Sequence, residues 1–109
     1  MTVFDEARRK DPTAPLFAEA RLNQMAYRLA RNDRRPDAIV IFRKIVELYP
    51  ASSNAYDSLA EALEAAGNRA ESVSMTRKGL EVLERETLPA ERKTQMKETL
   101  EGRLRRLPP

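Results

Sequence analysis

The sequence of 109 residues contains no cysteine, no histidine and no tryptophan, and only 3 glycines. Without cysteine and histidine the chain lacks thiolate nucleophiles, imidazole bases and the usual ligands of zinc. Because cysteine is absent, the chain is neither a disulfide scaffold nor a thiol redox sensor. We therefore expect that it is not an enzyme and that it uses neither a cofactor nor a metal ion.

Long apolar runs are also missing, and the first residues lack a basic region followed by an apolar core. Such runs would be needed to span a bilayer or to form a secretion signal. We expect a soluble, unprocessed chain with no membrane insertion. Acids and bases are interleaved and leave a net charge of only +3, so we also expect no nucleic-acid partner.

Charged residues make up 34% of the chain and hydrophobic residues 41%. Together with the low glycine content, this composition is typical of packed amphipathic helices. The length suits one modest domain. The sequence therefore predicts a single all-α domain.

Two helices are predicted in the first half of the chain. The first begins near Thr13 and ends at Asn32-Asp33, and its apolar face consists of Leu22, Met25, Ala26 and Leu29. The second lies between Pro36 and Pro50, and its apolar face consists of Ala38, Ile41, Phe42, Ile45 and Tyr49. These faces follow the spacing of a helix, and the short connection predicts a helical hairpin.

A second pair of helices follows. The third helix begins at the capping residues 52–54 and ends at Gly67, with an apolar face of Tyr56, Leu59, Ala60 and Leu63. Asn68 and Glu71 have the spacing of a capping box at the start of the fourth helix. Its predicted inward residues are Ala70, Val73, Leu80 and Leu83.

A fifth helix is expected to begin near residues 87–89, with a narrow apolar stripe of Met96, Leu100, Leu104 and Leu107. Three arginines, Arg103, Arg105 and Arg106, form the densest basic cluster of the chain. Positive residues suit the C-terminus of a helix. We interpret this cluster as a solvated last turn rather than as a phosphate site.

The first and third helices repeat each other, because the residues Leu22, Met25, Ala26 and Leu29 recur 34 positions later as Tyr56, Leu59, Ala60 and Leu63. This period and pattern resemble the tetratricopeptide repeat (TPR). The resemblance implies a short α-solenoid with repeats at residues 19–52 and 53–86 and a capping helix at residues 88–107. Residues 2–11 resemble a partial repeat or an N-terminal helix.

The second repeat departs from the family pattern, because Ser72, Thr76 and Gly79 occupy its small, aromatic and small positions. Such departures are expected in a terminal repeat. Residues 22–83, and residues 49–62 above all, look like TPR segments at the C-terminal end of bacterial serine hydrolases, either esterase-like or β-lactamase-like. That likeness implies an accessory module. The chain would be cytoplasmic if it stands alone, and periplasmic or secreted if it is a fragment of an exported hydrolase.

TPR arrays bind an extended peptide or a partner helix in a concave groove lined by the first helix of each repeat. The resemblance therefore implies a protein–protein interaction module that binds a polypeptide segment or a partner domain. The candidate contact residues lie on the two first helices, away from their apolar faces, and are Asn23, Gln24, Tyr27, Arg31, Asn54, Asp57, Ser58, Glu61 and Glu64.

Several alternatives remain open from the sequence. Tyr27 can serve as a partner contact or as ordinary packing, and the acidic residues can select a basic partner or be simply solvated. The chain as a whole can instead pack on a hydrolase domain or form a homodimer. Dimerisation is considered because two repeats bury little core.

Overall fold

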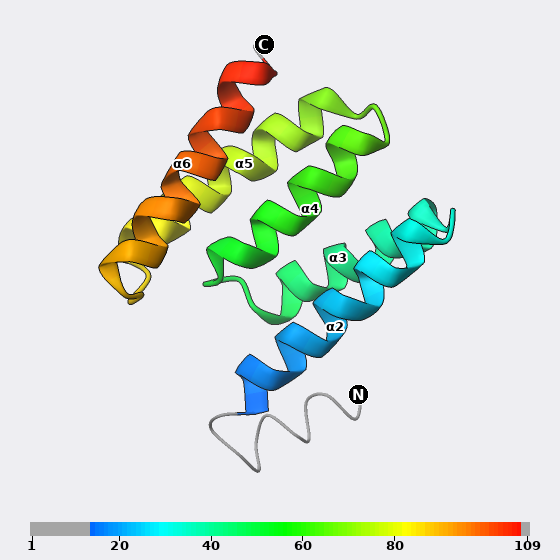
Figure 1. Cartoon of the computed structure of the whole chain (residues 1–109), viewed down its shortest axis with the longest axis horizontal. Helices are drawn as coiled ribbons and strands as arrows, with labels where there is room; N and C mark the ends of the chain where they lie inside the picture. Colours follow the sequence, from blue (N-terminus) through cyan, green and yellow to red (C-terminus); the bar gives the residue numbers. More distant parts are fainter. Residues whose placement is uncertain (1–13, 108–109) are drawn as a thin grey trace.

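A computed structural model of the chain describes residues 14–107 (Figure 1). Within this range the secondary structure is helical, as predicted, and consists of five helices: α2 (Ala14–Arg31), α3 (Arg35–Leu48), α4 (Ser53–Ala65), α5 (Arg69–Arg85) and α6 (Ala90–Arg106). The predicted partial repeat at residues 2–11 lies outside the described residues. The all-α class is therefore confirmed for the described part of the chain.

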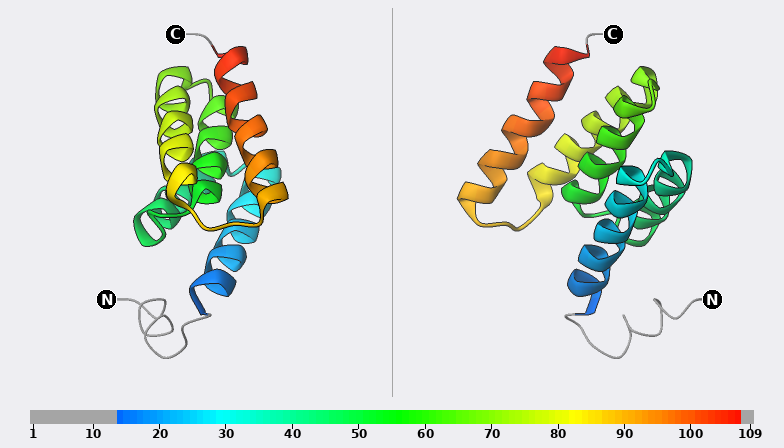
Figure 2. Two further views of the ribbon diagram at one scale, coloured as in Figure 1. Left: turned by 90° about the vertical axis from the view of Figure 1, so that its left-hand side faces the viewer. Right: turned by 45° about the vertical axis from the view of Figure 1, so that its right-hand side comes forward.

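The helices form two hairpins, α2 with α3 and α4 with α5, and α6 follows. Helices α2, α4 and α6 run in similar directions, with α2 in front of α3 and α6 in front of α5 in the view of Figure 1. Figure 2 shows α6 running along α4 and α5. Helix α4 is the central element, because it contacts all four other described helices.

The ends of α4 follow the predicted local signals. At its start, the hydroxyl of Ser52 accepts a hydrogen bond of 3.2 Å from the backbone N–H of Ala55, which satisfies one of the free amides of the first turn. After its last turn, Gly67 adopts a φ of 85°. Glycine enters this left-handed region without a steric penalty, so Gly67 allows the chain to turn back into α5.

The core lies between the two hairpins and contains most of the predicted apolar residues, including Leu22, Ala26, Ala38, Phe42, Ile45, Leu59 and Leu63. The prediction that Met25 belongs to the buried apolar face of α2 is wrong, because Met25 is 45% exposed. Met25 and Ala26 flank the α2 stripe on opposite sides. The neighbouring helices cover the Ala26 flank, where Ala26 is fully buried, and leave the Met25 flank open.

The buried face of α5 also differs from the prediction. Ala70 is exposed, while the residues in the departing repeat positions, Ser72, Thr76 and Gly79, are buried. The Ser72 hydroxyl donates to the Ala60 carbonyl at 2.7 Å, and the Thr76 hydroxyl donates to the Ser72 carbonyl at 2.8 Å. These small residues satisfy their own polar groups and bring α5 close to α4.

The start of α5 is only in part a capping box. The side chain of Asn68 accepts from the backbone N–H of Glu71 at 3.3 Å, as predicted. The carboxylate of Glu71, however, accepts from the side-chain amide of Asn68 at 3.1 Å and forms a two-point ion pair with Arg43 on α3. This ion pair lowers the pKa of Glu71 and links the two hairpins.

Candidate functional site

The predicted contact residues lie on α2 and α4, and with α6 these helices form one surface that we call the α2–α4–α6 face. Gln24, Arg31, Asn54 and Glu61 are exposed on it. Asn23, Tyr27, Asp57 and Glu64 are half-buried, and Ser58 is buried. Four of the nine predicted residues are therefore freely accessible, and the other five are partly or fully buried.

Tyr27 connects α2 to both neighbouring helices. Its ring packs edge-to-face on Phe42 of α3, with ring centroids 5.0 Å apart and an interplanar angle of 72°. Its hydroxyl donates a hydrogen bond of 3.3 Å to Ser58 of α4. Burial raises the pKa of the Tyr27 phenol to about 12, because ionisation in a desolvated position is unfavourable. Tyr27 thus takes part in packing, whatever contact it also makes with a partner.

Arg103 of α6 is buried, and the interpretation of this residue as part of a solvated last turn is wrong. Its guanidinium lies 2.8 Å from the carboxylate of Asp57 and 3.5 Å from that of Glu64. It also donates to the Thr76 hydroxyl at 3.4 Å. Arg103 follows Leu100 by three positions, so both side chains point from α6 toward α4 and α5.

The acidic character of α4 is therefore largely neutralised inside the chain. Glu64 also pairs with Arg106 at 3.0 Å, so both Asp57 and Glu64 are tied to α6. Among the acidic residues predicted as contacts, Glu61 is the exposed one. The charge that α4 offers to a partner is smaller than its sequence indicates.

A hollow of about 390 Å³ lies at the start of α4, and we call it the α4 N-terminal hollow. It is lined from α2, from the start of α4, from the segment that joins α5 to α6 and from the first half of α6: Glu19, Ala20, Ser52, Ser53, Asn54, Glu86, Leu88, Arg92 and Met96. The Ser52 hydroxyl donates to Glu19 at 2.6 Å, and the backbone N–H of Ser53 donates to Glu86 at 3.2 Å. Two carboxylates thus meet at one helix N-terminus.

The charge of Glu19 is only partly compensated at this place. Burial raises the pKa of Glu19, hydrogen bonds from Ser52 and Asn54 lower it, and the neighbouring charge of Glu86 raises it further. Among the predicted contact residues, only Asn54 lines this hollow. A signal was present, since each acid–serine pair is separated by 33 positions, which is close to the repeat period.

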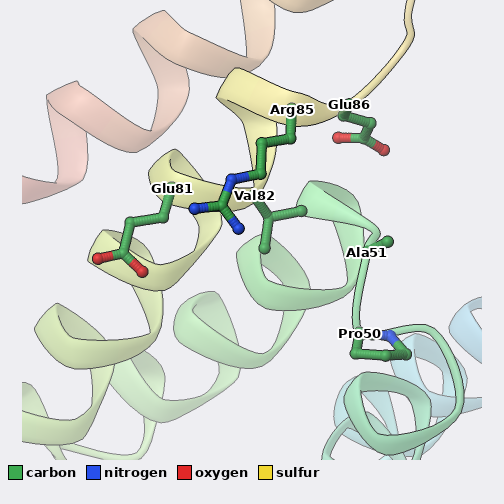
Figure 3. A pocket seen from close by; sticks show the side chains of 6 residues that line it. All are labelled: Pro50, Ala51, Glu81, Val82, Arg85 and Glu86. Carbon is green, nitrogen blue, oxygen red and sulfur yellow. The ribbon is translucent and has the colours of Figure 1, made fainter.

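Two of the other depressions on the described residues lie near this hollow or on α2. One of about 340 Å³ is bounded on α2 by Gln24, Tyr27, Arg28 and Arg31. The other, of about 220 Å³, lies between the α3–α4 connection and α5, and is lined by Pro50, Ala51, Glu81, Val82, Arg85 and Glu86. In Figure 3 the side chains of Val82 and Arg85 lie next to each other in this depression. The first coincides with three of the predicted contact residues.

Comparison with protein-family models, with curated proteins and with solved structures gave no match. Across residues 14–107, no group of three or more acidic residues is arranged to hold a metal ion. In the same range, no helix has both the length and the apolar character of a membrane span. The functional argument therefore depends on the α2–α4–α6 face itself.

Proposed function

We propose that this chain is a TPR-like protein–protein interaction module, and that it binds a polypeptide segment or a partner domain across the α2–α4–α6 face. One observation carries the proposal. Three helices that run in similar directions share this face, and a hollow of about 390 Å³ bounded by residues from α2, α4 and α6 opens between them. A face of this kind, with a hollow between its helices, suits the binding of an extended segment or a helix.

The accessible residues of the face are the proposed direct contacts, namely Gln24, Arg31, Asn54 and Glu61. Tyr27 would offer the exposed part of its ring, since a half-buried tyrosine is held rigidly and loses little conformational entropy on binding. Asp57 and Glu64 would act indirectly, because their ion pairs with Arg103 hold α6 beside α4. The proposal thus distinguishes the residues that would touch the partner from those that hold the helices of the face in place.

The proposal is tested with a charge-reversed variant of the face, Arg31→Glu/Glu61→Lys, used as bait in lysate of the source organism. Both residues are exposed, and the double change keeps the net charge constant. The matched control is Lys44→Glu/Glu47→Lys, which reverses an exposed pair on α3 and also keeps the net charge. Captured proteins are identified by mass spectrometry.

We expect at least one protein to be captured by the wild type and by the control and to be lost with the face variant. That protein is then tested for direct binding with purified components. If all three baits capture the same proteins, or none captures any, the proposed function is contradicted.

Self-association is the second candidate function, and the exposed apolar side chains of Val40 and Met25 favour it, with exposures of 65% and 45%. A dimer would bury apolar surface of this kind. It predicts that the melting temperature falls on dilution. A melting temperature that is unchanged over about a hundredfold dilution would contradict it.

A further inference from the structure

Two carboxylates face the α4 N-terminal hollow from different parts of the chain. Glu19 comes from the first half of α2, and Glu86 directly follows α5. Among the described residues, no lysine or arginine lies within 4.0 Å of either carboxylate. This differs from Asp57, Glu64 and Glu71, which all have cationic partners.

The two carboxylates already accept hydrogen bonds from the residues that begin α4, as described above, and the positive end of the helix dipole favours their charge. This compensation is incomplete. Burial and the charge of Glu86 both raise the pKa of Glu19, so a further positive group would stabilise the pair.

A third polar group at the same hollow, the Ser53 hydroxyl, lacks a hydrogen-bond partner among the described residues. Ser53 is 1% exposed, and its hydroxyl oxygen has no hydrogen-bond partner among the described residues. Buried polar groups are normally paired, because leaving one unpaired is unfavourable. Ser53 lines the hollow together with both acids, so a buried, unpaired hydroxyl lies at the wall that also carries two carboxylates.

The remaining wall of the hollow is partly apolar. Leu88 and Met96 are half-buried and line it from the α6 side. A long cationic side chain suits such a place, since its methylene groups cover apolar surface while its charged end reaches acceptors. An anion would instead meet two carboxylates against the single guanidinium of Arg92.

From this arrangement we propose that the α4 N-terminal hollow receives one lysine or arginine side chain of the bound polypeptide segment, between Glu19 and Glu86. The inference rests on the proposed function and specifies the chemistry of the partner. Arg92 also lines the hollow and opposes a second cation there, so its removal strengthens binding of the same segment.

The test uses a library of random peptides of about 12 residues displayed on phage, long enough to span roughly 40 Å when extended. The library is selected on the wild-type chain, on Glu86→Gln and on Glu19→Gln. Glutamine keeps an oxygen that accepts the hydrogen bond from Ser53 or Ser52, so only the charge is removed. The matched control is Glu98→Gln, which removes one exposed carboxylate outside the hollow.

We expect wild type and Glu98→Gln to enrich peptides with a lysine or arginine at one fixed position. That enrichment should disappear for Glu86→Gln and for Glu19→Gln. Replacing the basic residue of a selected peptide by norleucine should weaken its binding to the wild type about tenfold, as expected for the loss of a charge-assisted hydrogen bond. Arg92→Gln should bind the original peptide more tightly.

The outcomes separate the two proposals. If selected peptides compete with one another and lose affinity for the Arg31→Glu/Glu61→Lys variant, but show no basic preference, the inference is overturned and the proposed function stands. The same holds if the basic preference survives in both glutamine variants. If no peptide is enriched on any variant, segment binding itself fails, and the inference fails with it.

Discussion

The guanidinium of Arg103 lies 2.8 Å from the carboxylate of Asp57, a residue 46 positions earlier in the chain. This contact joins the last described helix to the central helix α4. The Arg103 side chain is 3% exposed and that of Asp57 is 15% exposed. Helix α6 is therefore held by a buried charge pair as well as by the apolar side chains of Leu100 and Leu107.

Removing the positive charge should strongly destabilise the fold. We expect Arg103→Met to lower the free energy of unfolding by about 3 kcal/mol, because Asp57 and Glu64 then keep their negative charges without the buried partner. Urea unfolding at neutral pH measures the difference.

Arg105→Met is the control for this change, since Arg105 is exposed on the same helix and its replacement should alter stability by less than about 0.5 kcal/mol. The double variant Arg103→Met/Asp57→Asn should recover part of the loss, because one unpaired charge is gone. Equal losses for Arg103→Met and Arg105→Met would show that the buried pair does not hold α6.

Local signals in the sequence predicted α2, α3 and α4 well. Ser52 and Gly67 mark the ends of α4 through their own backbone and side-chain chemistry, and these signals act within a few residues. The burial of Arg103 could not be predicted in this way, because it depends on two acids of α4 that only the tertiary fold brings together.

The same reason explains two further differences, at α5 and at the α4 N-terminal hollow. The buried face of α5 is set by close approach to α4 and α6, which favours Ser72 and Gly79 over the exposed Ala70. The α4 N-terminal hollow joins Glu19 to Glu86, and neither residue belongs to a local motif. Only the repeat period of the sequence carried information on that juxtaposition.

Gly79 is predicted to be required for the packing of α5 between its neighbours. A Cβ at this position would lie 3.3 Å from the Cβ of Tyr56 and 3.4 Å from both methyl groups of Leu100. Because the Tyr56 Cβ is fixed to the backbone, crowding should outweigh the helix propensity that alanine gains. We expect Gly79→Ala to lower the free energy of unfolding by about 1 kcal/mol.

Gly102→Ala provides a matched comparison on α6. A Cβ there would meet only the end of the flexible Arg105 side chain, at 3.7 Å, so the gain in helix propensity should stabilise the chain by about 0.5–1 kcal/mol. Denaturant unfolding of both variants shows whether each change raises or lowers the free energy of unfolding. A stabilising Gly79→Ala would contradict the proposed close packing.

The phenol of Tyr27 should make stability fall at alkaline pH. Its pKa is raised to about 12 in the folded chain, whereas an ordinary tyrosine ionises near pH 10. Between these values the unfolded chain releases the proton and the folded chain keeps it, so unfolding becomes more favourable as pH rises. The stability of Tyr27→Phe, measured by urea unfolding, should depend less on pH across this window.

The carboxyl group of Glu19 should make stability depend on pH in the acidic range. Its pKa is raised above the ordinary value of 4.5 by burial and by Glu86, so the folded chain binds this proton more tightly than the unfolded chain. The stability that results is complete below pH 4.5 and is lost as pH rises through the raised pKa.

Relative to Glu19→Gln, the wild type should therefore become more stable as pH is lowered from neutral toward 4.5. Glu86→Gln should reduce this trend, because it removes the neighbouring charge that raises the pKa of Glu19, while Glu98→Gln should follow the wild type. Urea unfolding at a series of pH values measures the stability of all four proteins.

A bound cationic peptide should lower the pKa of Glu19 and shift this pH dependence of stability to more acidic pH. Parallel pH profiles for wild type and Glu19→Gln would show instead that the carboxylate is already compensated, and the hollow would then have no unmet charge to offer a partner.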